Sequence, residues 1–167
     1  QGFEWWINRI KTQFTMVDYL RIDHFRGFEA YWAVPAGEET AINGKWKKGP
    51  GVELFNAIKE SLGDDMKIFA EDLGIITPEV EALRDECGFP GMKVLQFGFE
   101  AWPTDPFYPH NFKTTNCICY TGTHDNNTTF GWYEDAKEEA RDRVRRYLNC
   151  DGGNVSWDFV RLAMSSI

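Results

Sequence analysis

Carboxylates stand at three points of the chain where an apolar run ends. The first is in Arg21-Ile22-Asp23-His24-Phe25, where strand alternation predicts that Arg21, Asp23 and Phe25 share one face. Arg21 and Asp23 would then lie about 6–7 Å apart, and a guanidinium that close favours the ionised carboxylate. An ionised carboxylate at a strand end is a suitable nucleophile, although a structural ion pair explains the same pattern.

The second acidic segment is Phe69-Ala70-Glu71-Asp72-Leu73-Gly74. Glu71 follows the largely apolar residues 66–70, so we expect it in surroundings of low dielectric constant. Such surroundings disfavour the ionised form and would let Glu71 donate a proton near neutrality. Asp72 points to the other face and is expected to be structural. A structural role for Glu71, as a cap or ion-pair partner at the strand end, is the alternative.

The third segment is Thr121-Gly122-Thr123-His124-Asp125-Asn126-Asn127. Glycine lets the backbone approach another group closely, which suits a binding loop. His124 and Asp125 together could bind the hydroxyl groups of a sugar or a metal ion. The metal reading is the weaker one, since no second histidine or carboxylate lies at helical spacing from them.

Asp23, Glu71 and Asp125 are separated by 48 and 54 residues and follow three different predicted strands. Retaining glycosidic chemistry needs one carboxylate as nucleophile and another as acid/base, with their carboxyl groups about 5–5.5 Å apart. A third carboxylate can bind sugar hydroxyls more tightly as the ring flattens. The three acids together therefore indicate an enzyme that acts on glycosidic bonds.

Alternating strands and helices must position these side chains. Apolar spacing and turn signals predict strands at residues 17–25, 66–74, 92–100 and 117–125. Helices are predicted at residues 4–14, 52–63, 78–88, 134–149 and 157–164, with caps at Thr77 and Ser156. Residues 27–51 are rich in Gly, Pro and Asn and are expected to form a long irregular loop.

This order predicts an α/β fold with a parallel sheet and a site at the carboxyl ends of the strands. Four strands are half of the eight in a (β/α)8 barrel, so the pattern alone fits either an open sheet or part of a barrel.

Composition narrows the classes of partner. The net charge of −8 argues against nucleic acid, whereas a neutral glucan is compatible with an acidic surface. The seven tryptophans fill the core or line a sugar cleft. No run of 18 apolar residues is present, so no membrane span is expected. The four cysteines lack zinc spacing and are expected to be reduced thiols in a cytoplasmic or plastid protein.

Four stretches resemble, in order, the central blocks of the amylomaltase and disproportionating-enzyme family, the 4-α-glucanotransferases of glycoside hydrolase family 77. These stretches are VDYLRIDHFRGFEAYWAVPAGEETAINGKWKKGPG, FAEDLGIITPEV, GMKVLQFGFE and YTGTHDNNTTFGWY. The resemblance implies an elaborated (β/α)8 TIM-type barrel. By the same resemblance, residues 1–167 are the central part of that catalytic barrel, a single-domain fragment with about four βα units, approximately strands 4 to 7.

The resemblance also implies roles for individual residues. Asp23 takes the role of nucleophile, Glu71 that of acid/base and Asp125 that of transition-state stabiliser. Arg21 and His124 match positions that contact the sugar bearing the reacting bond. Asn43 and Trp46 lie in the family's long loop on the acceptor side. The family needs no metal ion and no organic cofactor.

The expected activity is the transfer of α-1,4-glucan segments between maltooligosaccharides by a retaining double displacement. An α-glucan hydrolase of the amylase type would use the same three carboxylates. A non-catalytic glucan-binding protein and a metal-dependent barrel hydrolase are the further alternatives.

Overall fold

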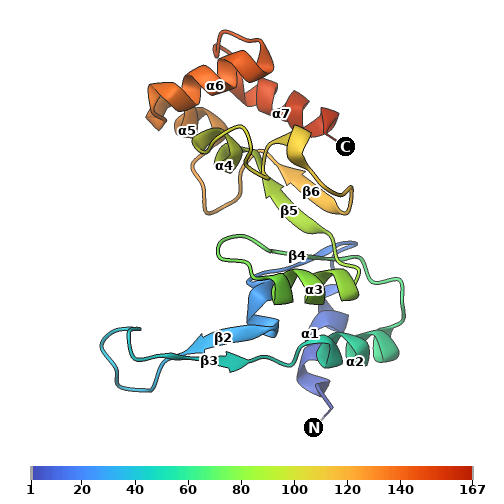
Figure 1. The fold of residues 1–167 in the computed structure, drawn as a ribbon. Coiled ribbons are helices and arrows are strands. Elements are labelled where there is room, and N and C mark those ends of the chain that lie inside the picture. Colours follow the sequence, from blue (N-terminus) through green and yellow to red (C-terminus); the bar gives the residue numbers. More distant parts are fainter. Residues whose placement is uncertain (1, 167) are drawn as a thin grey trace. The chain divides into compact units, whose positions relative to one another are not determined.

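The computed structural model describes residues 2–166, and the chain divides into two compact units, Gln1–Gly91 and Met92–Ile167 (Figure 1). The elements of the first unit are α1 (Glu4–Gln13), β1 (Leu20–Ile22), the 3₁₀ helix η1 (Phe25–Phe28), β2 (Ala30–Ala33), β3 (Lys45–Lys48), α2 (Val52–Leu62), β4 (Ile68–Ala70) and α3 (Pro78–Glu86). The second unit contains β5 (Gly91–Val94, beginning at the boundary), α4 (Leu95–Glu100), η2 (Pro109–Asn111), β6 (Cys117–Tyr120), α5 (Thr129–Asp135), α6 (Glu138–Leu148) and α7 (Val155–Ser165).

Strands β1 and β4 pair in parallel, as the alternating pattern predicts. Leu20 lies opposite Ile68 and Ile22 opposite Ala70, and the chain between the two strands contains α2. The described residues form two further two-stranded sheets, β2 with β3 and β5 with β6. The parallel pair thus carries Asp23 and Glu71 at its carboxyl end.

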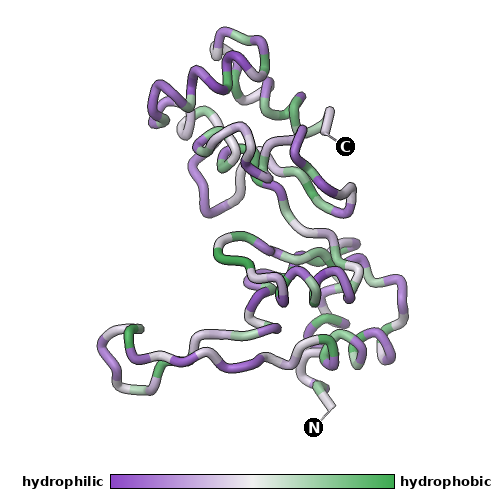
Figure 2. Tube along the Cα trace, in the orientation of Figure 1, coloured by the Kyte–Doolittle hydropathy of each residue, from purple (hydrophilic) through white to green (hydrophobic). Residues whose placement is uncertain are grey.

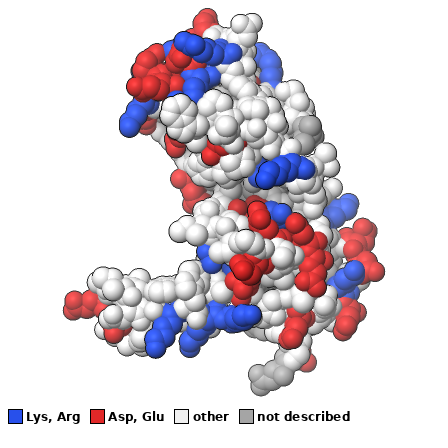
Figure 3. All heavy atoms as spheres, in the orientation of Figure 1, with Lys and Arg blue, Asp and Glu red and all other residues white. Residues whose placement is uncertain are grey.

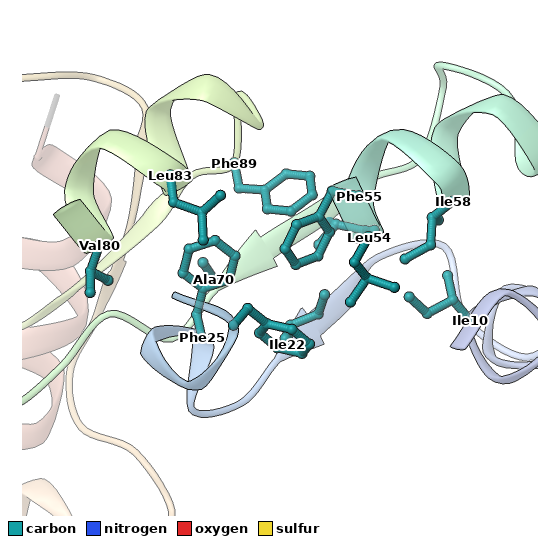
Figure 4. Packing of buried hydrophobic residues seen from close by; sticks show 12 residues of the cluster. Ile10, Ile22, Phe25, Leu54, Phe55, Ile58, Ala70, Val80, Leu83 and Phe89 are labelled. Atoms are coloured by element: carbon teal, nitrogen blue, oxygen red, sulfur yellow. The ribbon is translucent and has the colours of Figure 1, made fainter. Parts of the chain in front are cut away.

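An apolar core lies against one face of the β1–β4 pair (Figure 4). Ile22 and Ala70 point into it from the strands, and helix α2 contributes Leu54, Phe55 and Ile58. Four phenylalanine rings form its centre, with centroids 5.2–6.1 Å apart: Phe25, Phe28, Phe55 and Phe89. Burial of a phenylalanine side chain contributes about 1.5–3 kcal/mol, so this cluster is a main source of stability in the unit.

Strand β1 is shorter than the predicted strand 17–25. It ends at Ile22, and the chain turns through Asp23 and His24 into η1. The predicted alternation is therefore wrong at its end, because Phe25 joins Ile22 in the core while Asp23 and His24 are exposed.

The predicted loop 27–51 contains an antiparallel hairpin, so the prediction of a wholly irregular segment is wrong. Trp32 on β2 faces Trp46 on β3, and their rings meet edge to face with centroids 5.4 Å apart. Cross-strand aromatic pairs of this kind stabilise a sheet by roughly 0.2–1 kcal/mol. The sequence Lys45–Lys48 lacks the apolar alternation that would have predicted β3.

Residues 92–100 do not form one strand, contrary to the prediction. Strand β5 ends at Val94, and helix α4 begins at Leu95. Gly98 lets this helix pack against the following loop, since a Cβ there would lie 3.1 Å from the carbonyl carbon of Phe107. Short apolar runs of this length fit a strand and a buried helix equally well.

Helices α1, α2 and α3 are confirmed, with Pro78 opening α3 and Thr77 at its N-cap position. The predicted helix 134–149 is instead two helices, α5 and α6, separated by the extended residues Ala136 and Lys137. Asn154 rather than Ser156 occupies the N-cap position of α7. The core of the second unit explains the early start of α5, since it buries Trp132 and Tyr133.

The surfaces of the helices follow their sequences. Helix α6 is largely hydrophilic (Figure 2), and ion pairs such as Arg146–Asp142 run along it. Lysines gather along the β2–β3 hairpin (Figure 3). Burial, with Glu86 nearby, raises the pKa of the Cys87 thiol to about 11. Within residues 2–166, no helix is both long enough and apolar enough to cross a membrane.

Asp72 holds α3 to the end of β4, which agrees with the structural role expected for it. Its Oδ2 atom lies 2.5 Å from Nη1 of Arg84, and its side chain is only 7% exposed. Arg84 also contacts Asp85, whose side chain is 64% exposed. A Cβ at Gly91 would lie 2.3 Å from Oδ2 of Asp72, so the glycine leaves room for this ion pair.

We therefore expect the two acidic partners of Arg84 to differ in their effect on stability. In the full-length protein, Asp72→Asn should lower the free energy of unfolding by about 1–3 kcal/mol, because Arg84 loses its buried partner and keeps only the exposed Asp85. Asp85→Asn, the matched control, should lower it by less than about 1 kcal/mol, because the lost partner is exposed. Urea unfolding of both variants checks this, and equal losses would contradict it.

Candidate active site

The Asp23 carboxylate follows the last residue of β1 and is paired with Arg21. The distance from Nη2 of Arg21 to Oδ1 of Asp23 is 2.8 Å. The Asp23 side chain is 68% exposed, whereas that of Arg21 is 23% exposed. Both residues line a hollow of about 310 Å³ together with Trp6, Arg9 and Phe28. The predicted closeness of Arg21 and Asp23 is thus confirmed, and the carboxylate is accessible from solvent.

Glu71 follows β4 and is held by the backbone of both neighbouring segments. Its Oε2 atom accepts a hydrogen bond from the backbone N–H of His24 at 2.8 Å, and its Oε1 atom accepts one from Leu73 at 2.8 Å. Its own N–H donates to the carbonyl oxygen of Ile22 at 2.9 Å, and its carbonyl oxygen accepts from Phe25 at 3.2 Å. Glu71 is therefore fixed next to the turn that contains Asp23.

The strand register accounts for this closeness. Ile22 pairs with Ala70 at the end of the ladder, and Asp23 and Glu71 are the residues that directly follow β1 and β4. Adjacent strands lie about 4.7–4.9 Å apart, so the two acidic residues leave the sheet edge side by side.

His24 makes the connection possible through an unusual backbone conformation. Its φ and ψ angles are 50° and 49°, in the left-handed region. This conformation costs a residue with a side chain roughly 1–2 kcal/mol. The turn directs the N–H of His24 to Glu71, and the ring lies over Gly27, where a Cβ would be 2.8 Å from Nδ1. Sequence reasoning missed His24, because nothing in its residue type predicts a positive φ.

Arg26 is a second residue that the sequence did not single out. Its Nη1 atom donates to the carbonyl oxygen of Ile75 at 2.5 Å, in the segment that follows Glu71. Its guanidinium carbon lies 4.4 Å from the centroid of the Trp46 ring. Arg26 therefore ties the β2–β3 hairpin to the end of β4. One sequence signal could have identified Arg26. In the motif Arg21-Ile22-Asp23-His24-Phe25-Arg26, an arginine stands on each side of Asp23.

Asn43 and Trp46 lie on the hairpin, as their positions in the sequence require. The side-chain amide of Asn43 donates to Oε2 of Glu38 at 2.7 Å, within the loop that joins β2 to β3. Trp46 is 56% exposed, with Arg26 against its ring face and Trp32 at its edge. An exposed ring held in this way is able to stack on a sugar.

His124 and Asp125 lie in the second unit, in the turn after β6. Nε2 of His124 is 3.3 Å from Oδ1 of Asp125, and their side chains are 69% and 72% exposed. Oδ1 of Asn126 accepts from both the N–H and the hydroxyl of Thr123, at 2.9 and 3.0 Å. The turn is thus closed by its own side chains, and it presents both predicted residues to solvent.

The structure brings Arg21, Asp23 and Glu71 together in the first unit and His124 with Asp125 in the second. That the two groups converge on one site stays a prediction. In the part of the chain that the structure describes, no three His, Cys, Asp or Glu side chains are grouped to hold a metal ion.

Comparison with known proteins connects these features to a family. The family described as 4-alpha-glucanotransferase matches residues 1–167. The chain is 53% identical to the 4-alpha-glucanotransferase of Synechocystis sp. over 167 residues, which cover 99% of this chain and 33% of the relative. It is 48% identical to the 4-alpha-glucanotransferase of Thermus thermophilus over 175 residues, covering 100% of this chain and 35% of that protein. For the chloroplastic/amyloplastic enzyme of Solanum tuberosum the identity is 46%, over 99% of this chain and 29% of the relative.

A solved structure has the same fold. The amylomaltase from Streptococcus agalactiae, in complex with acarbose, superposes with a TM-score of 0.91 at 41% identity. The match covers 99% of this chain and 33% of that chain, so the sequence spans about a third of the length of the proteins that it resembles. Since the match extends from end to end, the chain belongs to the 4-alpha-glucanotransferase family, glycoside hydrolase family 77.

Proposed function

We propose that the whole protein transfers α-1,4-glucan segments between maltooligosaccharides by a retaining double displacement. The observation that carries this proposal is the attachment of the Glu71 carboxylate to the backbone beside Asp23, at the ends of two paired parallel strands. The family membership and the acarbose complex of the amylomaltase, a glucan mimic bound to a relative, support α-glucans as the substrate class.

In the first displacement, the Asp23 carboxylate attacks the anomeric carbon of the donor sugar. Arg21 orients this carboxylate through its 2.8 Å ion pair. Glu71 donates a proton to the departing glycosidic oxygen, and a covalent glucosyl-enzyme results. In the second displacement, Glu71 removes the proton from the 4-hydroxyl of an acceptor sugar. That oxygen attacks the anomeric carbon and releases Asp23, so the configuration is retained.

Asp125 and His124 complete the proposed site. Asp125 stabilises the oxocarbenium-like transition state through sugar hydroxyls, and His124 contacts the same sugar. Their exposure and their closed turn support these roles. Asn43 and Trp46 are proposed for the acceptor side, where the exposed Trp46 ring would stack on an incoming sugar. The proposed chemistry uses no metal ion and no cofactor.

The proposed architecture is a partial (β/α)8 barrel. Strands β1, β4, β5 and β6 would be approximately strands 4 to 7, and residues 1–167 would be the central part of one catalytic barrel domain. The parallel β1–β4 pair supports this, as does the hydrogen bond from the N–H of Ala70 to the carbonyl oxygen of Pro90, which continues the pairing toward β5. A cytoplasmic or plastid location completes the proposal, and the chloroplastic/amyloplastic relative supports the plastid case.

Incubation of the full-length protein with maltotriose tests the proposed reaction. We expect glucose together with maltooligosaccharides longer than the substrate, because an acceptor hydroxyl intercepts the glucosyl-enzyme. Maltose and glucose without longer products would mean that water is the acceptor and that the protein is a hydrolase. No product of either kind would favour a non-catalytic role.

Asp23→Ala should abolish transfer. The loss of kcat/KM should be at least about 10⁴-fold, as is usual for removal of a nucleophile. Asp18→Ala is the matched control, since Asp18 is an exposed acid in the segment before β1 and should leave the rate unchanged. Product analysis by chromatography measures both. Normal transfer by Asp23→Ala would refute the mechanism.

Trp46→Ala should weaken acceptor binding. An aromatic contact is worth about 0.5–1.5 kcal/mol, so KM for a glucose acceptor should rise by up to about tenfold. The control is Trp5→Ala, which removes another exposed tryptophan of the same unit (64% exposed, on α1). Initial rates at varied acceptor concentration distinguish the two, and an unchanged acceptor KM for Trp46→Ala would remove Trp46 from the site.

A further inference from the structure

Gln96 is a buried polar residue for which the proposed mechanism has no use. Among residues 2–166 it is the one polar or charged residue in the fully buried class, at 1% exposure. It is the second residue of α4, directly after the Val94–Leu95 junction between β5 and the helix. Each polar group of a buried amide that is left unpaired lowers the stability by about 1–3 kcal/mol, so an apolar residue at this position would give a more stable fold.

The Gln96 amide contacts both ends of the turn that carries His124 and Asp125. Its Nε2 atom donates to the carbonyl oxygen of Asn127 at 3.2 Å. At the other end of the turn, a Cβ on Gly122 would lie 2.6 Å from Nε2 and 3.1 Å from the amide carbon. Gly122 therefore lets the amide lie against the backbone. The carbonyl oxygen of Asn127 is an acceptor, so the part of the Gln96 amide that faces it is the NH2 group. This contact therefore determines the orientation of the Gln96 amide.

Within the turn, few other contacts determine where His124 and Asp125 lie. Asn126 and Thr123 close the turn on themselves, and the N–H of Asp125 donates to the Thr123 hydroxyl at 3.3 Å. These bonds fix the shape of the turn but not its position in the unit. In the described residues, two hydrogen bonds join the end of the turn to the rest of the unit: the one from Gln96 to Asn127, and one from the Asn127 amide to Asp135 of α5 at 3.2 Å.

The carbonyl oxygen of the Gln96 amide supports a functional reason for the burial of this residue. In the described part of the chain its Oε1 atom is buried and accepts no hydrogen bond. A side chain selected only for stability would not keep this unpaired oxygen in the core. Unpaired buried polar atoms of this kind are found at functional sites, where a particular side-chain geometry is kept although it lowers stability.

We propose that Gln96 is a positioning residue for the reaction: its amide holds the Gly122–Asn127 turn so that Asp125 and His124 meet the reacting sugar correctly. This inference rests on the proposed transferase function. Gln96 is 1% exposed, so in this proposal it acts through the turn and not by contact with the sugar. A displacement of about 1 Å in a catalytic group reduces rates by up to about 10²-fold, so loss of the amide should act mainly on kcat.

Gln96→Met in the full-length protein tests the proposal, because it keeps the volume and removes both the donor and the unpaired oxygen. We expect kcat on maltotriose to fall about 10- to 100-fold with little change in KM, while the urea midpoint stays equal or rises. Tyr108→Phe is the control, since it removes a buried hydroxyl group from an aromatic side chain of this unit and should leave kcat unchanged. A lower urea midpoint with wild-type kcat for Gln96→Met would assign Gln96 a purely structural role and overturn the proposal.

Gln96→Glu supplies a second readout that a structural role would not move. The introduced carboxyl group can donate to Asn127 only when protonated, so the ratio of variant to wild-type kcat should rise as the pH falls. A ratio that is constant with pH would overturn the proposal, including in the case that Gln96→Met does not fold. Wild-type protein without transferase activity would refute the proposed function itself, whereas active wild type with unaffected variants would refute only the role of Gln96.

Discussion

Two backbone N–H groups hold the Glu71 carboxylate at the carboxyl end of the β1–β4 pair. Both carboxylate oxygens take part, each with one hydrogen bond of 2.8 Å, so the orientation of the carboxyl group is fixed. One donor belongs to His24, the residue after Asp23, and the other to Leu73. The proposed roles of Asp23 and Glu71 depend on this connection, because it links the segment with the proposed nucleophile to the side chain that would move the proton.

The connection requires a strained turn, and the core that follows offsets the strain. A left-handed His24 costs roughly 1–2 kcal/mol, while burial of a phenylalanine contributes about 1.5–3 kcal/mol. Phe25 and Phe28, immediately after the turn, are 0% and 9% exposed. The chain is therefore pulled down into the core directly after His24, which leaves Asp23 and His24 at the surface. Arg26, between the two phenylalanines, adds a tie to the hairpin and to Ile75.

In the second unit, too, a side chain contacts the turn that carries the proposed site residues. The Gln96 amide donates a hydrogen bond to the carbonyl oxygen of Asn127, at the end of the turn after β6. At the other end of the turn, a Cβ on Gly122 would lie 2.6 Å from Nε2 of Gln96, so a larger residue there would displace the amide. In each unit, then, exposed acidic residues are presented by a tight turn whose position is set by a polar group just beneath it.

Helices α1, α2 and α3 and the parallel pairing of β1 with β4 could be predicted from the residues alone, because burial of one face leaves a periodic apolar pattern along the chain. The sequence also carried enough family motifs to predict the roles of Asp23, Glu71 and Asp125. It did not determine the β2–β3 hairpin, the change from strand to helix at Leu95, the left-handed His24 or the burial of Gln96. These features were decided by the tertiary structure. Each arises from contacts between residues distant in the chain, such as Trp32 with Trp46 and Glu71 with His24, and local periodicity carries no record of such pairings.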